Sequence, residues 1–326
     1  MKTFGSRIAV ITGGGTGMGR ELARQLAAEG CHVALCDVSA EHMAETKALA
    51  ERGAPRGTRV TTHVCDVSDE RQVLAFRDAV VQQHGDHVHL VFNNAGIAGG
   101  GSLFTDEREV WERVFAVCWY GVYYGTRAFL PLLVAAPEGH LVNTSSVNGF
   151  WASLGPGIPH TAYSAAKFAV KGFTEALIND LRMNAPHVHV HLVMPGHVGT
   201  SIVLNSPAVL GRPGPKEMTA EDLRVVRARM AQRGLPADAL GDDQLRAVMQ
   251  QLAEDFRDKA PLGAAAAATL ILDGVREGRW RILVGQDAEE LDRMVRAAPE
   301  RAYEPGFMEE LRARGHLELP LTPGEE

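Results

Sequence analysis

Cysteine is scarce in this sequence, and its arrangement argues against a zinc site. The 326 residues include four cysteines, Cys31, Cys36, Cys65 and Cys118, which lie in or beside apolar runs. None belongs to a C-x2-C pair, the spacing typical of structural zinc sites. We therefore expect reduced, buried thiols, as in a cytoplasmic protein, and no bound metal.

Long apolar runs and an excess of positive charge are also lacking. No stretch approaches the roughly 18 apolar residues of a membrane span, and the first apolar run, 8–11, is too short for a signal peptide. The 33 basic and 40 acidic residues give a net charge of -7, which does not attract nucleic acid or anionic lipid. We expect a cytoplasmic protein with no nucleic-acid or membrane partner.

Short β-branched runs alternate with amphipathic stretches along most of the chain. The runs that predict strands are 7–12, 32–37, 59–66, 89–96, 140–146, 188–196 and 279–284. The stretches that predict helices are 19–29, 41–52, 70–84, 107–134, 163–183 and 264–277. Because parallel strands need crossover connections, this alternation predicts the α/β class with a doubly wound parallel sheet.

The strand signals stop after Thr200, where proline, glycine and charged residues take over. One helix in this region is expected to begin at Thr219, which has Asp222 three residues later as a capping partner. We expect residues 1–284 to form a single domain, with a helical insertion at 200–262 that covers the open end of the sheet. Residues 285–326 are expected to form a partly flexible C-terminal extension, with a frayed tail at LPLTPGEE.

A glycine cluster follows the first predicted strand and leads directly into a helix. The segment Thr12 to Gly19 reads TGGGTGMG, and glycines in this context allow a tight turn and a close approach of a pyrophosphate to the helix N-terminus. The alternative is an ordinary strand-to-helix turn. Asp37, at the end of the second strand, lies near the offset at which a carboxylate binds the adenosine ribose. Since Val38 and Ser39 offer no positive charge to a 2′-phosphate, the pair of features predicts NAD rather than NADP.

A second group of polar residues follows the fifth predicted strand. Ser146 precedes Tyr163 and Lys167, which have the spacing Y-x-x-x-K at the start of a helix. Residues four apart share a helix face, so the ammonium of Lys167 can lower the pKa of the Tyr163 phenol and make it a usable base. The alternative is a solvated helix face with a tyrosine packed on the core.

These motifs occur together in an order that resembles the short-chain dehydrogenase/reductase family. The ordered pieces are TGGGTGMG, Asp37, CDV (65–67), NNAG (93–96), SS (145–146), YSAAK (163–167) and PGHVGT (195–200). The resemblance covers residues 5–200 and, more loosely, 263–284. It implies a Rossmann fold in which Tyr163 is the general base, Lys167 binds the nicotinamide ribose and Ser146 orients the substrate oxygen.

The resemblance also implies a set of cofactor-binding residues. Asp66 and Val67 would flank the adenine, Asn93, Ala95 and Gly96 would line the nicotinamide side, and the loop 195–200 would hold the carboxamide. The full expected set is Gly13, Gly15, Thr16, Gly17, Met18, Gly19, Asp37, Val38, Asp66, Val67, Asn93, Ala95, Gly96, Tyr163, Lys167, Pro195, Gly196, Val198 and Thr200. The alternative role for each of these residues is packing.

Two features depart from the family pattern. Cys118 stands where the family places an asparagine that binds a water of the proton relay, and a thiol is a weak hydrogen-bonding group. The segment between Ser146 and Tyr163 is a few residues longer than usual, so Trp151 and Pro156 are expected to reshape the substrate pocket.

Two further patterns are more consistent with packing than with chemistry. His187, His189 and His191 alternate along one predicted strand, but no carboxylate is interleaved, so we expect no metal there. The aromatic residues Trp111, Phe115, Trp119, Tyr120, Tyr123 and Tyr124 have helical spacing. We expect them to pack in the core and in the contact of a homodimer or homotetramer.

The sequence therefore predicts an NAD-dependent oxidoreductase that acts on a small-molecule secondary alcohol or ketone. Residues 1–284 would be its dinucleotide-binding catalytic domain, with 200–262 as the substrate lid. Three alternatives stay open: a nucleotide-binding module of the same fold with weakened catalysis, a carbonyl reductase that works mainly in the reductive direction, and an isomerase or dehydratase on the same scaffold.

Overall fold

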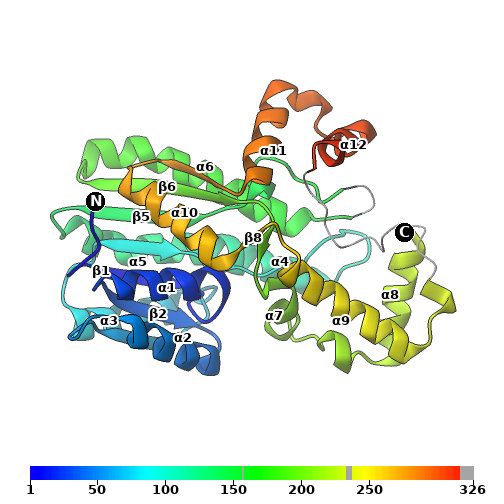
Figure 1. The fold of residues 1–326 in the computed structure, drawn as a ribbon, viewed down its shortest axis with the longest axis horizontal. Coiled ribbons are helices and arrows are strands. Elements are labelled where there is room, and N and C mark those ends of the chain that lie inside the picture. The colour runs from blue at the N-terminus through cyan, green and yellow to red at the C-terminus, as the bar shows by residue number, and fades with distance from the viewer. Residues whose placement is uncertain (156–157, 233–236, 316–326) are drawn as a thin grey trace.

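A parallel sheet of seven strands forms the centre of the molecule (Figure 1). The computed structural model describes residues 1–155, 158–232 and 237–315. In sheet order the strands are β3 (Val60–Val64), β2 (His32–Asp37), β1 (Ile8–Thr12), β4 (Leu90–Asn93), β5 (Gly139–Thr144), β6 (Val188–Pro195) and β9 (Arg281–Val284). The order reverses between β1 and β4, and ligands of open α/β sheets bind in the crevice beside such a reversal.

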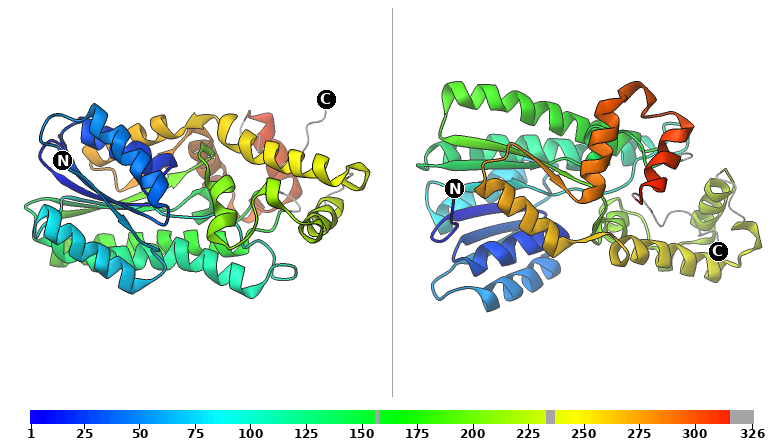
Figure 2. Two further views of the ribbon diagram at one scale, coloured as in Figure 1. Left: turned by 90° about the horizontal axis from the view of Figure 1, so that it is seen from below. Right: turned by 45° about the horizontal axis from the view of Figure 1, so that its top comes forward.

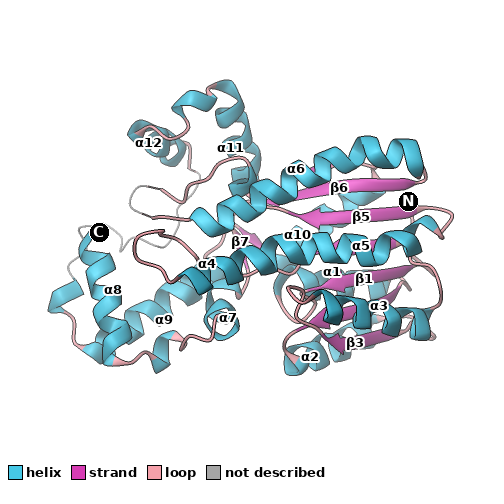
Figure 3. Ribbon diagram, turned by 180° about the vertical axis from the view of Figure 1, so that it is seen from behind, coloured by secondary structure: helices cyan, strands magenta, loops and turns pink. Residues whose placement is uncertain are grey.

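Helices cover both faces of the sheet (Figures 2 and 3). One face carries α1 (Gly17–Ala28), α2 (Ala40–Gly53) and α10 (Ala264–Arg276). The other carries α3 (Glu70–His84), α4 (Arg108–Phe115), α5 (Gly121–Val134) and α6 (Thr161–Asn184). Alternate residues of β1 serve the two faces: Val10 packs with α3 and α5, whereas Ala9 and Ile11 pack with α1 and α10. Burial on both faces explains why the strands are continuously apolar in the sequence.

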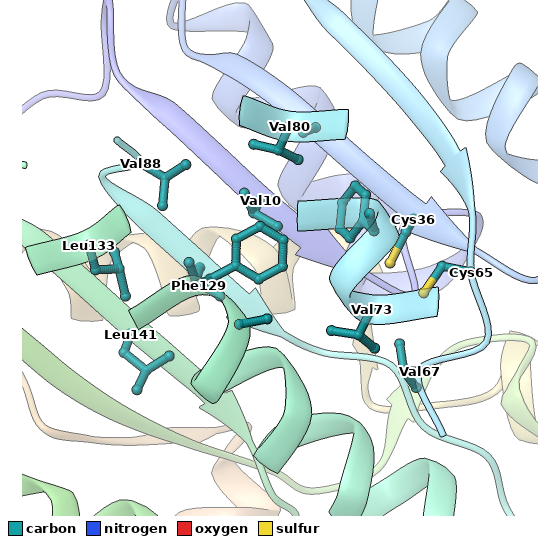
Figure 4. Packing of buried hydrophobic residues seen from close by; sticks show 14 of the residues in the cluster. Val10, Cys36, Cys65, Val67, Val73, Val80, Val88, Phe129, Leu133 and Leu141 are labelled. Atoms are coloured by element: carbon teal, nitrogen blue, oxygen red, sulfur yellow. The ribbon is translucent and has the colours of Figure 1, made fainter. Parts of the chain in front are cut away.

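The cysteines belong to this packed interior. All four are buried free thiols. In Figure 4, Cys36 and Cys65 lie with Val67 and Val73 in the cluster of buried side chains around Phe129. Their burial agrees with the expectation of buried thiols.

Two groups of helices lie beyond the carboxyl ends of the strands (Figure 1). The first includes α7 (Ile202–Val209), α8 (Ala220–Gln232) and α9 (Asp242–Asp258), with short 3-10 turns at Pro215–Glu217 and Ala237–Ala239. As predicted, α8 follows a reciprocal cap: Thr219 N donates to Asp222 Oδ2 at 2.7 Å, and Asp222 N donates to Thr219 Oγ1 at 3.3 Å. A helical insertion therefore occupies the predicted interval.

The second group is the C-terminal extension. It contains α11 (Gln286–Ala297), a 3-10 turn (Pro299–Arg301) and α12 (Pro305–Ala313), and it packs on Trp151 through Leu291, Phe307 and Leu311. The part of the extension that the structure describes is thus helical and has its own small core. The predicted frayed tail, LPLTPGEE, lies outside the described residues.

The predicted strands and helices are present, with two differences. The expected helix over 107–134 is interrupted by a π-helical segment, η1 (Ala116–Tyr120), and the two-residue strands β7 (Val198–Gly199) and β8 (Leu262–Gly263) form a second small sheet. A 3-10 turn, η2 (Val147–Gly149), follows β5. Among the described residues, no helix combines the length and the apolar character needed to cross a membrane.

Candidate active site

The glycine cluster forms a tight loop between β1 and α1. Gly13 and Gly17 have positive φ angles of 65° and 54°, a conformation that side chains disfavour. A Cβ on Gly13 would lie only 2.7 Å from the Cα of Ala95, so the loop also requires glycine for space. The loop brings the N-terminus of α1, with its positive dipole end, to the edge of a cavity. The backbone N–H groups of the loop and the positive dipole end of α1 are suited to bind a pyrophosphate.

Asp37 ends β2 beside this loop, as the sequence predicts. Its Oδ2 accepts a hydrogen bond from Gly15 N at 3.0 Å, and its Oδ1 accepts one from Ser39 N at 3.1 Å. These bonds orient the carboxylate at the cavity wall. The nearby arginine, Arg113, is already paired with Asp66 at 2.6 Å. Burial acts to raise the pKa of Asp66, but hydrogen bonds from Arg113 and Ser68 outweigh it and hold that pKa below its ordinary value.

The cavity has a volume of about 370 Å³, and eleven of the predicted cofactor residues lie on its wall. Those on its wall are Gly13, Thr16, Gly17, Met18, Asp37, Val38, Asp66, Val67, Ala95, Gly96 and Thr200. Gly15 and Gly19 do not line it, but they pack against Asp37 and the Gly13 carbonyl, where a Cβ would clash. This combination of a glycine cradle, a helix N-terminus and a ribose-binding carboxylate fits a dinucleotide.

Asn93 is not placed as predicted. Its side chain is buried in the core, where Nδ2 donates to Thr126 Oγ1 at 3.1 Å and to Asn143 Oδ1 at 2.8 Å. Asn94 lines the cavity instead, and its Nδ2 donates to Thr12 O at 3.1 Å. Successive side chains of an extended segment point in opposite directions, so only one of the two can reach the cavity.

The loop after β6 is also placed differently from the expectation. Thr200 reaches the cavity, but Pro195, Gly196 and Val198 do not line it. His197 N donates to Asp287 Oδ2 at 2.6 Å, and a Cβ on Gly196 would collide with the same carboxylate. The start of the C-terminal extension therefore holds this loop in position.

Ser146, Tyr163 and Lys167 come together at the carboxyl end of β5. Ser146 Oγ accepts a hydrogen bond from Asn148 N at 3.1 Å. Lys167 Nζ lies 5.4 Å from the centroid of the Tyr163 ring and donates to Thr144 O at 2.9 Å. Gly96 lies on the cavity wall, and a Cβ there would lie 3.6 Å from Lys167 Nζ, so the ammonium lies close behind that wall. The triad is therefore assembled next to the predicted nicotinamide position.

The protonation of Tyr163 differs from the sequence-based expectation. Burial raises the pKa of its phenol above the ordinary value, the neighbouring Cys118 sulfur acts in the same direction, and the Ser146 hydroxyl acts to lower it. Burial likewise lowers the pKa of Lys167, and Cys118 opposes that shift. Lys167 Nζ donates to Thr144 O and lies 5.4 Å from the centroid of the Tyr163 ring, and burial outweighs its charge in setting the pKa of the phenol. Tyr163 is thus held as a neutral phenol in this arrangement.

Helix α7 lies along the cofactor cavity, and its residues Ser206 and Val209 are on the cavity wall. Val209 and Leu210 belong to the same hydrophobic cluster as Tyr163, and Asn205 Nδ2 donates to Thr16 Oγ1 at 3.4 Å. Ser206 Oγ accepts from Ala98 N at 2.8 Å. A second cavity of about 230 Å³ lies next to His160, whose ring centroid is 4.8 Å from that of Tyr163.

Two features of the site differ from what the sequence predicts: α7 lines the cofactor cavity, and Trp151 lies away from the substrate pocket. Ile202, Leu204, Asn205 and Val209 all line the cofactor cavity, although the apolar residues of this segment were expected over the substrate. Trp151 is turned away from the site, and its Nε1 donates to Ala302 O at 2.7 Å. Pro156 lies outside the described residues.

Comparison with known proteins agrees with this geometry. Residues 7–208 match the family described as short chain dehydrogenase. SadH of Mycobacterium tuberculosis strain H37Rv, which is named as an oxidoreductase, is 37% identical over 297 residues, covering 91% of this chain and 92% of SadH.

Two solved structures are similar over long segments. A short-chain dehydrogenase/reductase from Burkholderia phymatum in complex with NAD has a TM-score of 0.69 and 30% identity, with all of both chains covered. A metagenomic short-chain oxidoreductase in complex with NADP has a TM-score of 0.51 and 30% identity over 59% of this chain and 83% of its own.

The fold and the site together define a nucleotide-dependent oxidoreductase built on a doubly wound sheet. The chain belongs to the short-chain dehydrogenase/reductase family. Members of this family act on small-molecule substrates. In this chain the glycine loop and Asp37 line one cavity, and Lys167 lies behind Gly96 on the wall of that cavity.

Proposed function

We propose that this protein is an NAD-dependent oxidoreductase that moves a hydride between the nicotinamide and the carbon of a secondary alcohol or ketone. The observation that carries the proposal is the position of Asp37 in the cofactor cavity, together with Ser146, Tyr163 and Lys167 next to that cavity. NAD would supply the hydride acceptor or donor, and the residues of the chain would position the substrate and move its proton.

Each residue of the triad has a distinct part in this proposal. Ser146 Oγ, at the end of β5, is available to hydrogen-bond the substrate oxygen. Tyr163 Oη takes the hydroxyl proton during alcohol oxidation and returns it during ketone reduction. Lys167 keeps a positive charge within 5.4 Å of the phenol ring, which favours the phenolate once the tyrosine has lost its proton.

Electrostatics support NAD over NADP. Asp37 and Asp66 place two carboxylates on the cavity wall. Among the described residues, Arg113 is the only arginine on this wall, and its charge is neutralised by the ion pair with Asp66. A 2′-phosphate next to Asp37 would be repelled by about 1 to 4 kcal/mol. Because about 1.4 kcal/mol is a tenfold change in affinity, NAD should bind about 5-fold to 1,000-fold more tightly.

The first experiment is a calorimetric titration of the protein with NAD+ and with NADP+ at one ionic strength. We expect the wild type to prefer NAD+, and the double variant Asp37→Ala/Val38→Arg to prefer NADP+, because the variant removes the repulsion and adds a phosphate-binding guanidinium. Asp86→Ala removes an equally negative but exposed side chain, so it should leave the preference unchanged. Equal wild-type affinity for the two cofactors would show that Asp37 has been misinterpreted.

The second experiment decides between catalysis and the alternatives. Absorbance at about 340 nm would follow NADH in both directions, with a panel of secondary alcohols and the corresponding ketones. A nucleotide-binding module with weakened catalysis would bind NAD+ but give no turnover, a carbonyl reductase would favour the ketones, and an isomerase or dehydratase would convert substrate without net NADH change.

Assembly and cellular location stay predictions. The homodimer or homotetramer is supported by the aromatic surface of α4, η1 and α5, where Tyr120 is 41% exposed and stacks on Tyr124 at 5.6 Å. Light scattering on the purified protein would measure its mass in solution. The expected location is the cytoplasm.

A further inference from the structure

A cluster of three histidines and a glutamate lies at the end of the sheet opposite the active site. His140 is the second residue of β5, and its register partner on β6 is His189. His191 follows two residues later on the same face, and Glu138 immediately precedes β5. Ser146 is six residues further along the chain from His140, about 20 Å at the rise of a strand, so this cluster is separate from the catalytic site.

The hydrogen bonds of the cluster require more protons than two neutral imidazoles carry. His191 Nδ1 lies 2.6 Å from Arg279 O, and because a carbonyl only accepts, this nitrogen must donate. His140 Nδ1 lies 2.8 Å from His191 Nε2, and His140 Nε2 lies 3.2 Å from Glu138 Oε1. These three contacts need three protons, whereas two neutral rings supply two. The contact between His140 Nε2 and Glu138 Oε1 therefore lacks a proton, and an added proton or a cation bound between the two side chains would complete it.

Burial makes the added proton unfavourable, because a charged imidazole would have to sit among side chains that water does not reach: His140 is 1% exposed and His191 is fully buried. The amino group of Met1 lies 2.8 Å from Oε1 of Glu138 and pairs with it as an ion pair. With the proton chain running from His140 to the Arg279 carbonyl, the Nε2 lone pair of His140 faces an oxygen of Glu138.

We propose that Glu138, His140 and His189 bind a divalent transition-metal ion, with Zn²⁺ as the first candidate. One nitrogen or oxygen atom from each of the three side chains lies within 4.8 Å of the others. Two histidines and one carboxylate form a common zinc ligand set, which leaves a fourth position for water. The His191 ring and the Arg279 carbonyl would fix the tautomer and direction of His140, as outer partners of metal-binding histidines do.

The surroundings allow the three ligands to converge. Zinc bonds of about 2.0 to 2.2 Å need ligand atoms closer together than 4.8 Å, and the exposed His189 and the bend at Glu138 can supply this movement. Met1 N and His140 Nε2 both contact Oε1 of Glu138, so Oε2 is the oxygen assigned to the ion. His187 is not included, because its Nε2 is bonded to Val134 O at 2.9 Å.

An ion at this place would join the segment before β5 to the start of β6. It is too far from Tyr163 to take part in proton or hydride transfer. We therefore expect the ion to stabilise the folded chain, because a ligand that binds only the native state raises the free energy of unfolding. Turnover per folded molecule should be unchanged.

The test uses untagged, full-length protein freed of metal with a chelator. Calorimetric titration with Zn²⁺ should give one ion per chain and a higher melting temperature. Co²⁺ should give the visible absorption bands of a tetrahedral site. His189→Ala, which changes an exposed side chain, should weaken Zn²⁺ binding by about 100-fold or more and remove the Co²⁺ bands, whereas His187→Ala on the same segment should leave both intact.

Three results would overturn the proposal. One is the absence of Zn²⁺ binding at micromolar concentration in a wild type that is folded and binds its nucleotide. Another is equal weakening by His187→Ala, which would indicate adventitious binding to surface histidines. The third is a nitrogen NMR spectrum that shows a charged, doubly protonated His140 at neutral pH, since an added proton would then complete the contact with Glu138.

Discussion

Tyr163 is the residue on which desolvation and hydrogen bonding act in opposite directions. Desolvation raises the pKa of its half-buried phenol, while the Ser146 hydroxyl favours the charged form. A base with a raised pKa is deprotonated in only a small fraction of molecules at neutral pH. The rate of alcohol oxidation should therefore increase as the pH rises, and this increase should extend into the alkaline range.

Tyr163→Phe tests the assignment of the base. The ring should keep its contact with His160 and its place in the hydrophobic cluster, so NAD+ affinity should change little. Turnover should fall by roughly two to four orders of magnitude, because only the ionisable oxygen is lost. Steady-state rates across pH, together with calorimetric NAD+ binding, provide the measurement.

The matched control is Tyr120→Phe, which removes an exposed phenol from the π-helical segment and should leave both rate and affinity unchanged. If Tyr163→Phe retained its turnover and its pH dependence, another group would have to be the base.

At the scale of residues, type and spacing in the sequence are informative at positions where the backbone or a charge requires one particular residue type. Gly13 and Gly17 must be glycine for their positive φ angles, and Asp37 ends a strand that points at the glycine loop. Asn93 and Asn94 are the same residue type, so the sequence contained no information on which one faces the cavity. Asp287 could not be foreseen, because it reaches the loop after β6 from 90 residues further along the chain.

At the scale of elements, the π-helical segment η1 is the feature that periodicity could not reveal. Residues 107–134 are apolar on more than one face, so one extra residue in a turn leaves the helical pattern unchanged. The segment turns Cys118 toward the site, where its Sγ lies 3.4 Å from Ile97 O. The relay role of this position stays a prediction, and the local backbone geometry came only from the structure.

Cys118→Asn tests the role of this position. The amide can donate to Ile97 O in place of the thiol, and the substitution removes a sulfur that raises the pKa of Tyr163. We expect equal or higher turnover and a pH profile of alcohol oxidation displaced to lower pH. The melting temperature must be measured as well, because overpacking at a fully buried position costs about 1 to 3 kcal/mol.

Cys118→Ser is the matched variant, since it keeps the size of the side chain and a donor for Ile97 O. If Cys118→Asn folded with the melting temperature of the wild type but lost a hundredfold or more of its turnover, while Cys118→Ser did not, the relay interpretation would be contradicted.

The C-terminal extension shows a second limit at the scale of elements. Its helices were not predicted, because their apolar residues are few and their partner, Trp151, lies about 150 residues earlier in the chain. Trp151 was expected at the substrate pocket, and nothing in the sequence indicates that its ring instead contacts the C-terminal extension. Only the contact with Ala302 and Phe307 explains why the segment after Ser146 contains it.

At the scale of the whole molecule, the class of the fold followed from alternation alone. Apolar β-branched runs separated by amphipathic stretches require a parallel sheet covered on both faces. The order β3-β2-β1-β4-β5-β6-β9 and the helices at its carboxyl edge needed the structure, because nothing in a strand's own composition identifies its neighbours. The same holds for the buried histidines: the strands that contain them were predicted, but their hydrogen-bond partners were not.

One of these histidines makes the stability of the whole molecule depend on pH. His89 is 4% exposed, and its Nδ1 accepts a hydrogen bond from Ile8 N in β1 at 3.2 Å, which requires the neutral ring. Burial, and to a smaller extent Arg7, lowers its pKa to about 4 from an ordinary value near 6.5. Between pH 6.5 and 4 the unfolded chain therefore binds more protons than the folded chain. The free energy of unfolding should fall on acidification across this window by up to about 1.4 kcal/mol per pH unit from this residue.

His89→Gln tests this dependence. The glutamine oxygen can accept from Ile8 N without titrating, so urea unfolding at several pH values between 4.5 and 8 should give a shallower loss of stability on acidification, by about 1 kcal/mol per pH unit. His187→Gln is the control, because His187 Nε2 donates to Val134 O and keeps that donor when protonated. That variant should retain the slope of the wild type. Equal slopes for the wild type and His89→Gln would contradict this interpretation. The buried His89 ring would then accept a proton in the folded protein as readily as in the unfolded chain, and its hydrogen bond with Ile8 N would not contribute to the acid sensitivity of the fold.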